Sequence, residues 1–94
     1  MTHDRPRFAL GRVVATPGAL AAIEECGHSL LAYICRHQVG DWGNVGPEDW
    51  AENELSLRQG LRLLSAYNLP SGKRLWVITE ADRSVTTALL PREY

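Results

Sequence analysis

Residues 61–90, LRLLSAYNLPSGKRLWVITEADRSVTTALL, decide the fold of this chain because apolar side chains alternate with polar or smaller ones along them. A period of two is typical of β-strands, whose successive side chains point to opposite faces of a sheet. The segment Asn68–Lys73 carries Pro-Ser-Gly and predicts a hairpin loop, and Ala81–Ser84 predicts a second turn. The stretch therefore predicts three strands in an antiparallel meander, which Pro91 ends.

The chain before residue 61 predicts one strand followed by helices. Phe8–Ala15 is rich in apolar and β-branched residues and predicts the strand. Thr16 and Ser29 are placed to cap two helices, since their hydroxyls can accept from free backbone N–H groups. A third helix is predicted from Pro47 to the glycine at Gly60, where a left-handed C-terminal residue is expected.

This order of elements predicts one α+β domain over residues 1–94. The predicted sheet is antiparallel and consists of the N-terminal strand and the C-terminal three-stranded meander. Two or three helices are expected on one face of it. Trp50, Leu55 and Leu57 supply the expected apolar side of the third helix.

Composition narrows the classes of function. The chain has 94 residues, 45% of them hydrophobic, and ten basic residues against eleven acidic ones give a net charge of −1. Nucleic-acid binding driven by counterion release favours a clustered excess of Lys and Arg, which this composition does not supply. No stretch approaches the roughly 20 apolar residues of a membrane-spanning helix, and no signal peptide is recognisable, so a cytoplasmic location is expected and membrane binding is not.

The second turn of the meander is the most concentrated group of charges. Glu80, Asp82 and Arg83 lie within four residues, and Arg62 shares a face with Glu80 if the first two meander strands pair. Carboxylates beside a guanidinium can perform acid–base chemistry, and an arginine can stabilise a developing oxyanion. The alternative is a structural turn held by charge pairs, in which Ser84 and the neighbouring threonines cap backbone groups.

Two Cys-x-His pairs raise the question of a metal site. They are Cys26 with His28, and Cys35 with His37. Thiolate and imidazole are good zinc ligands, but residues two apart in a helix point to different sides. We therefore predict no metal site, and expect two reduced, buried thiols and two surface imidazoles. No cofactor is expected either, because the glycines form no phosphate-loop spacing.

Three tryptophans are candidate contacts for a partner. Trp42 follows Asp41 between two glycines of a polar loop, where an exposed anchor and a core position are both compatible with the sequence. Core packing is favoured for Trp50, and Trp76 is expected on a sheet face. If exposed, these indoles suit a protein partner or stacked bases.

Four blocks of the chain resemble a family of small bacterial proteins labelled plasmid-related and met on plasmids and integrative elements. The resemblance covers nearly the whole chain and is most specific in the last block. It implies a mobile-element setting and no particular activity. The blocks are residues 8–20 (FALGRVVATPGAL), 40–43 (GDWG), 64–67 (LSAY) and 76–91 (WVITEADRSVTTALLP).

A weaker resemblance links the strand succession to barnase-like and RelE-like ribonucleases. It is carried by residues 62–65 and 75–79, together with Asp82 and residues 86–87. It implies Arg62 and Arg83 on the phosphate and Glu80 as general base. The chain has Arg83 about where barnase-like enzymes have a catalytic histidine, and it lacks their basic charge.

Two functions follow as hypotheses. The first is a non-enzymatic accessory protein of a mobile element that binds and regulates a protein partner through Asp41, Trp42, Glu80, Asp82 and Arg83. The alternative is a small ribonuclease toxin acting on RNA with Arg62, Glu80 and Arg83. Whether the protein is an enzyme is left open. A homodimer through an uncovered sheet edge is compatible with either function.

Overall fold

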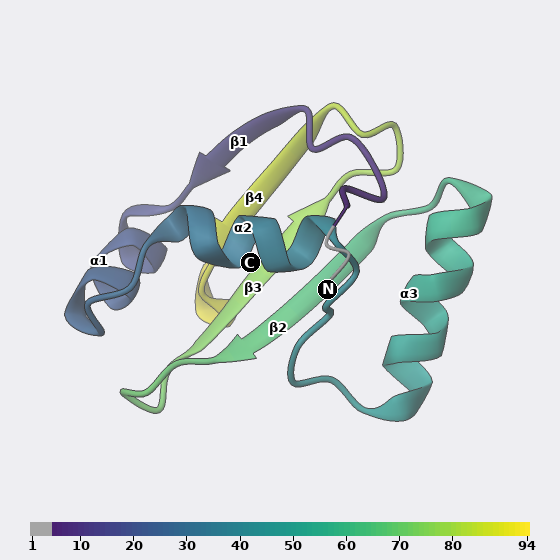
Figure 1. Ribbon diagram of the computed structural model, residues 1–94. Helices are drawn as coiled ribbons and strands as arrows, with labels where there is room; N and C mark the ends of the chain where they lie inside the picture. The colour runs from purple at the N-terminus through teal and green to yellow at the C-terminus, as the bar shows by residue number, and fades with distance from the viewer. Residues whose placement is uncertain (1–4) are drawn as a thin grey trace.

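The computed structural model describes residues 5–94 and consists of a four-stranded sheet and three α-helices (Figure 1). The α+β class predicted from the sequence is confirmed. The elements in chain order are β1 (Arg12–Ala15), α1 (Pro17–Glu25), α2 (Leu30–Gln38), α3 (Pro47–Gln59), β2 (Leu63–Asn68), β3 (Arg74–Thr79), β4 (Val85–Leu89) and a short 3₁₀ turn, η1 (Pro91–Glu93).

The order of strands across the sheet is β1-β4-β3-β2. The predicted meander is confirmed, because β2 pairs antiparallel with β3 and β3 antiparallel with β4. The prediction of a wholly antiparallel sheet is wrong, since β1 pairs parallel with β4. The connection from β1 to β4 contains the three helices, β2 and β3, and is long enough for a parallel pair. Alternation has the same period in both kinds of pairing, so the sequence pattern could not reveal the direction.

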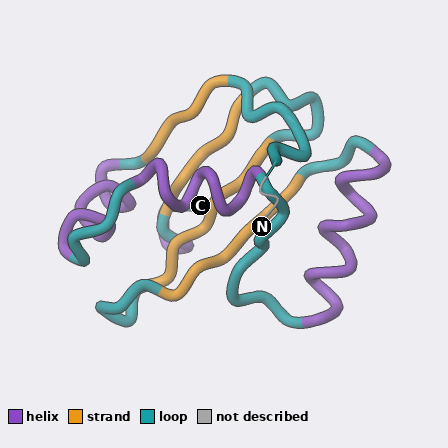
Figure 2. Tube along the Cα trace, in the orientation of Figure 1, coloured by secondary structure: helices purple, strands orange, loops and turns teal. Residues whose placement is uncertain are grey.

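Helices α1 and α2 pack on one face of the sheet, and α3 lies beside the edge strand β2 (Figures 1 and 2). The expected caps are confirmed: the Thr16 hydroxyl accepts from the Ala19 N–H at 3.1 Å, and the Ser29 hydroxyl accepts from the Ala32 N–H at 3.2 Å. Among the described helices, none has the length and hydropathy needed to cross a bilayer.

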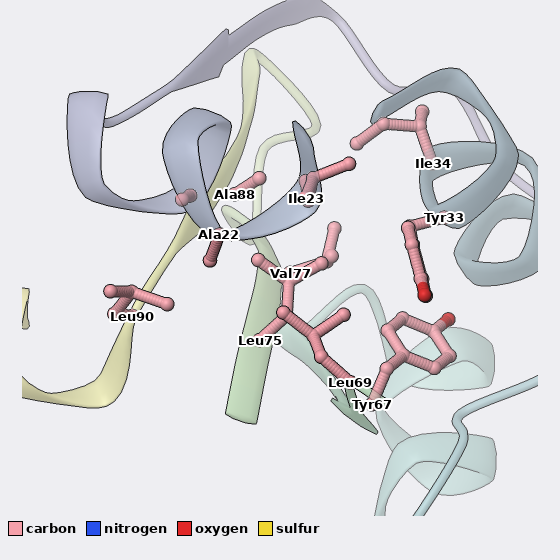
Figure 3. Packing of buried hydrophobic residues seen from close by; sticks show 11 residues of the cluster. Ala22, Ile23, Tyr33, Ile34, Tyr67, Leu69, Leu75, Val77, Ala88 and Leu90 are labelled. Carbon is pink, nitrogen blue, oxygen red and sulfur yellow. The ribbon is translucent and has the colours of Figure 1, made fainter. Parts of the chain in front are cut away.

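The core fills the space between the sheet and the first two helices (Figure 3). Burial of this apolar surface is the main favourable term in folding. The sheet contributes alternate residues of each strand, because only one face meets the helices. The core cluster consists of Ala19, Ala22, Ile23, Tyr33, Ile34, Tyr67, Leu69, Leu75, Val77, Ala88 and Leu90.

Helix α3 differs from the prediction. It buries Asn53 and Ser56, whereas Trp50 is 38% exposed and Leu55 and Leu57 are half-buried. A helix that lies against a strand edge meets backbone polar groups, and those groups need hydrogen-bonding side chains. Its buried side is therefore polar.

Strand β1 is shorter than the predicted Phe8–Ala15 because the chain turns sharply at Gly11. Gly11 has φ +65°, and any Cβ there would overlap the Ser84 carbonyl. Only glycine meets both conditions without strain. Phe8, ahead of the turn, leaves the sheet and packs its ring edge-on against His37 at 5.2 Å between centroids.

Candidate functional site

The charged turn between β3 and β4 is held by local hydrogen bonds. The Arg83 N–H donates to the Glu80 carbonyl at 2.9 Å, and Arg83 takes a left-handed φ of 60°. The Ser84 N–H donates to an Asp82 carboxylate oxygen at 3.0 Å. Hydrogen bonds from the side chain and then the backbone of Ser84 lower the pKa of Asp82. Within the described chain, the turn is thus held by local hydrogen bonds and not by the charge pairs of the structural alternative, and Asp82 is the capping residue in place of Ser84.

The Arg83 guanidinium binds backbone carbonyls. Its Nη1 donates to the carbonyls of Leu61 at 2.7 Å, Glu80 at 3.1 Å and Ala81 at 3.2 Å. Its Cζ also lies 5.7 Å from the centroid of the Phe8 ring. Arg83 therefore links the turn to the segment that precedes β2. In this conformation its Nη1 donors serve the protein's own backbone.

We expect Arg83→Ala to lower the free energy of unfolding by about 2–3 kcal/mol, because several carbonyls lose a charged donor. Denaturant unfolding followed by circular dichroism measures the change. Arg58→Ala, which removes an exposed guanidinium from α3, is the matched control and should change stability by less than about 0.5 kcal/mol. If the two variants were equally stable, Arg83 would be free to hold a phosphate, as the ribonuclease hypothesis requires.

Arg62 and Glu80 lie one position beyond the Leu63–Thr79 pair, on the same face of the sheet. The register thus brings these two predicted residues to one rim. The Arg62 guanidinium lies 5.7 Å from the centroid of the Tyr94 ring. Among residues 5–94, the side-chain ion pairs are Arg7–Glu54, Arg36–Asp41 and Lys73–Glu25, and none includes Arg62, Glu80 or Arg83.

Trp42 lies in the core. Its side chain is 0% exposed, and its Nε1 donates to Glu54 at 2.9 Å. Asp41 beside it pairs with Arg36 at 2.8 Å and accepts from the Gly43 N–H at 3.1 Å. In this conformation the surface here consists of the partly exposed Asp41 and of Arg36 from α2, and the indole is not part of it.

His37 is a buried polar residue that the sequence analysis placed on the surface. Its Nδ1 lies 2.6 Å from the Ser65 hydroxyl, and its Nε2 lies 2.9 Å from the Thr79 hydroxyl. The Thr79 hydroxyl bonds that of Thr86 at 2.7 Å, and Thr86 donates to the Leu10 carbonyl at 2.7 Å. The chain of hydrogen bonds thus runs from β2 to the segment before β1.

Burial places this imidazole outside the reach of a substrate. The His37 side chain is 0% exposed. Burial, with a smaller contribution from the charge of Arg83, lowers the pKa of His37 to about 3. The ring is therefore neutral at physiological pH, and each nitrogen has a hydroxyl partner. The sequence did contain a signal for this buried polar cluster. Ser65, Thr79 and Thr86 each fall at strand positions whose side chains share a face with core residues.

Cys35 and His37 lie in α2, where residues two apart point to different sides, whereas Cys26 and His28 lie in the connection between α1 and α2 and not in a helix. Cys35 is exposed, contrary to the expectation of a buried thiol, and Cys26 is half-buried. His28 bonds the Tyr33 hydroxyl through Nδ1 at 2.6 Å. Within residues 5–94, no group of three potential ligands is close enough to hold a metal ion.

The β2 edge of the sheet is covered by hydrogen-bonding groups from outside the meander. The Asn53 carboxamide donates to the Leu64 carbonyl at 2.7 Å and accepts from the Leu64 N–H at 3.1 Å. Ala66 donates to the Trp42 carbonyl at 3.1 Å and accepts from the Asn44 N–H at 2.6 Å. Gly43 enables this approach with φ +82°, because a Cβ there would overlap the Ala66 carbonyl.

Further along β2, the Asn44 side chain accepts from the Asn68 N–H at 2.9 Å. Every second residue of β2, the set whose backbone groups point outward, thus has a partner. Such coverage is a known protection against unwanted strand pairing.

The β1 edge is open over the part of the chain that the structure describes. Arg12 and Thr16 donate inward to the carbonyls of Ser84 and Ala88 at 2.9 and 3.0 Å. Because successive residues of a strand direct their backbone groups to opposite sides, Val13 and Ala15 direct theirs away from β4. β4 is the only strand paired with β1 among residues 5–94. Val13 and Val14 are 42% and 37% exposed.

No protein-family model, curated protein or solved structure matches this chain. Function is therefore inferred from the geometry of the described residues.

Proposed function

We propose that this protein is a non-enzymatic binding module that accepts an extended segment of a protein partner as an additional strand on β1. The contrast between the two sheet edges carries the proposal. Asn53, Asn44 and the backbone at Trp42 occupy the outward groups of β2, whereas no strand within residues 5–94 lies beside those of Val13 and Ala15. An uncovered edge is a ready template for another chain.

The residues of the β1 edge indicate what kind of partner segment would bind there. Val13 and Ala15 each offer one N–H and one carbonyl for main-chain hydrogen bonds. Val13 and Val14 present exposed apolar side chains to opposite faces, which favours β-branched residues in the added strand. Arg12 is exposed at the start of the edge and favours a carboxylate beside it. An edge of four residues implies an affinity in the range of about 1 μM to 1 mM.

This proposal keeps partner binding and moves it from the Trp42 loop to β1. The buried Trp42 and the carbonyl-bound Arg83 favour this location over the residues first considered. The resemblance to plasmid-related proteins suggests that the partner belongs to a mobile element or its host. Binding is preferred to RNA cleavage, because Arg83 is hydrogen-bonded to the protein's own backbone.

The proposal predicts that Val13→Pro weakens binding of extended peptides by at least about tenfold. Proline removes the outward N–H of residue 13, and an edge strand tolerates it where that N–H has no partner. A display library of linear peptides, selected on the wild-type protein, supplies the probes. Their affinities for wild type and variant are then measured by fluorescence anisotropy.

Val13→Thr is the matched control, since threonine keeps both the backbone donor and the β-branch. Selected peptides should bind it within about threefold of wild type. Peptides that bind the proline variant as tightly as wild type would contradict strand addition. Self-association that Val13→Pro abolishes would identify the added strand as β1 of a second copy.

A further inference from the structure

The sheet face opposite α1 and α2 carries an aromatic pair. Trp76 of β3 is half-buried, and Tyr94 is 66% exposed. Their ring centroids are 5.7 Å apart with an interplanar angle of 71°. Trp76 alternates with the core residues Leu75 and Val77, so it lies on the face away from the helices. An exposed tyrosine beside a partly exposed indole offers flat apolar surface for stacking.

Arg62 and Arg74 lie near this pair, and Arg12 is on the same face at the opposite end of β4. The Arg62 guanidinium lies 5.7 Å from the Tyr94 ring centroid. Arg74 is two residues from Trp76 and therefore shares its face. On β1, Arg12 is opposite Val85, again on this face. Among the described side chains, none of these arginines forms an ion pair with an acid.

A basic cavity lies at the end of the sheet where β3 begins and β4 ends. It has a volume of about 300 Å³ and is lined by Lys73, Arg74 and Arg92, with Leu90 and Pro91 as apolar walls. Lys73 also contacts Glu25 at 3.1 Å, and Arg74 donates through Nη2 to the Asn44 carbonyl at 2.5 Å, so two of the three cations share their donors with the protein itself. Three cations around an apolar floor suit a phosphate attached to a less polar body.

The acidic residues of α3 limit the path of an anion. Asp49 and Glu52 line a second cavity of about 350 Å³ together with Arg62. A polyanion is repelled from that side. Because Arg62 itself lines that acidic cavity, the favourable path for an anion runs from Tyr94 over Trp76 to the basic cavity.

These observations distinguish between classes of polyanion. A duplex hides the faces of its bases, whereas a single strand can place them on aromatic rings. An acidic peptide would use the arginines but gain little from the aromatic pair. We propose that this face binds single-stranded nucleic acid, with bases on Tyr94 and Trp76 and a phosphate in the cavity of Lys73, Arg74 and Arg92. This site is separate from the β1 edge.

The test is fluorescence anisotropy with labelled single strands of about twelve nucleotides, one oligo-U and one oligo-dT. Both should bind with a Kd of about 10⁻⁴ M or tighter at low salt. Tyr94→Ala should weaken binding about tenfold, because a stacking surface is lost. Arg92→Ala should weaken binding and lower the slope of log K against log salt by about 1. A preference between the two strands identifies RNA or DNA as the ligand.

Three controls make the outcome decisive. Tyr94→Phe keeps the ring, Arg58→Ala removes a cation from α3, and Val13→Pro alters only the β1 edge; all three should bind as wild type does. Failure of the single strands to bind would overturn the proposal. So would equal binding of a duplex of the same length, equal competition by polyglutamate, or a loss with Arg58→Ala that matches the loss with Arg92→Ala. None of these results bears on strand addition at β1, because Val13→Pro separates the two sites.

Discussion

Replacing His37 with alanine is expected to lower the free energy of unfolding by about 3–5 kcal/mol. The substitution leaves the Ser65 hydroxyl without its partner at 2.6 Å and removes the partner of Thr79 at 2.9 Å. A buried hydroxyl without a partner costs about 1–3 kcal/mol. The lost ring also leaves a cavity beside Phe8 and Trp42, whose rings are 5.2 and 5.7 Å away.

Urea unfolding monitored by tryptophan fluorescence measures this loss. His28→Ala removes an exposed imidazole with a single hydrogen bond, to the Tyr33 hydroxyl, and should cost about 1 kcal/mol. His37→Gln restores a donor and an acceptor and should recover part of the stability. A loss for His37→Ala no greater than that for His28→Ala would contradict the buried hydrogen-bond chain.

The second large effect is a dependence of stability on pH that originates at His37. An unfolded histidine has a pKa of about 6.5, whereas that of folded His37 is lowered to about 3. Below pH 6.5 the unfolded chain therefore binds a proton that the folded protein does not take up. The stabilisation is complete above about pH 6.5 and is lost as the pH falls towards 3, a change on the order of 4 kcal/mol.

The range between pH 6.5 and 5 isolates this effect, because it lies above the pKa values of ordinary carboxyl groups. Urea unfolding of the wild type should show a loss of about 2 kcal/mol across this range. His37→Gln should be nearly independent of pH there, and His28→Ala should retain the wild-type slope. A wild-type slope that persists in His37→Gln would assign the effect to another group.

The sequence predicted the local structure well, because local rules determine it. Thr16 and Ser29 cap helices as expected, and the hairpin loop after β2 lies where its glycine and proline predict. The direction of β1 is a tertiary property. This direction depends on the long connection between β1 and β4, which contains the three helices, and on the close approach of Gly11 to Ser84. No residue pattern within β1 encodes it.

The candidate residues were less predictable, because their neighbours come from distant parts of the chain. Arg83 looked like a catalytic cation in a polar turn, but its partner carbonyls include Leu61, 22 residues earlier. Trp42 lies between Asp41 and Gly43 in a polar loop, yet Glu54 of α3 accepts a hydrogen bond from its indole N–H and allows full burial. Overall charge was equally misleading, since Arg92 joins the adjacent cations Lys73 and Arg74 only in the folded protein.

The two proposed sites lie on the same sheet but bind their ligands by different chemistry. Strand addition depends on backbone groups at the rim of β1, and nucleic-acid binding depends on aromatic and cationic side chains on the face. Arg12 lies where the edge meets the face and is the one residue that both arguments use. A strand added to β1 would extend the sheet, and with it the face proposed to bind nucleic acid.

Amide hydrogen exchange resolved by residue, with and without a peptide selected on the wild-type protein, tests strand addition most directly. In the free protein, Arg12 and Thr16 should exchange slowly because their N–H groups donate to β4, and Val13 and Ala15 should exchange fast. Peptide binding should slow exchange at Val13 and Ala15 and leave Leu64 and Asn68 unchanged. Tight peptide binding with the amides of Val13 and Ala15 still exchanging at their free rates would contradict the account.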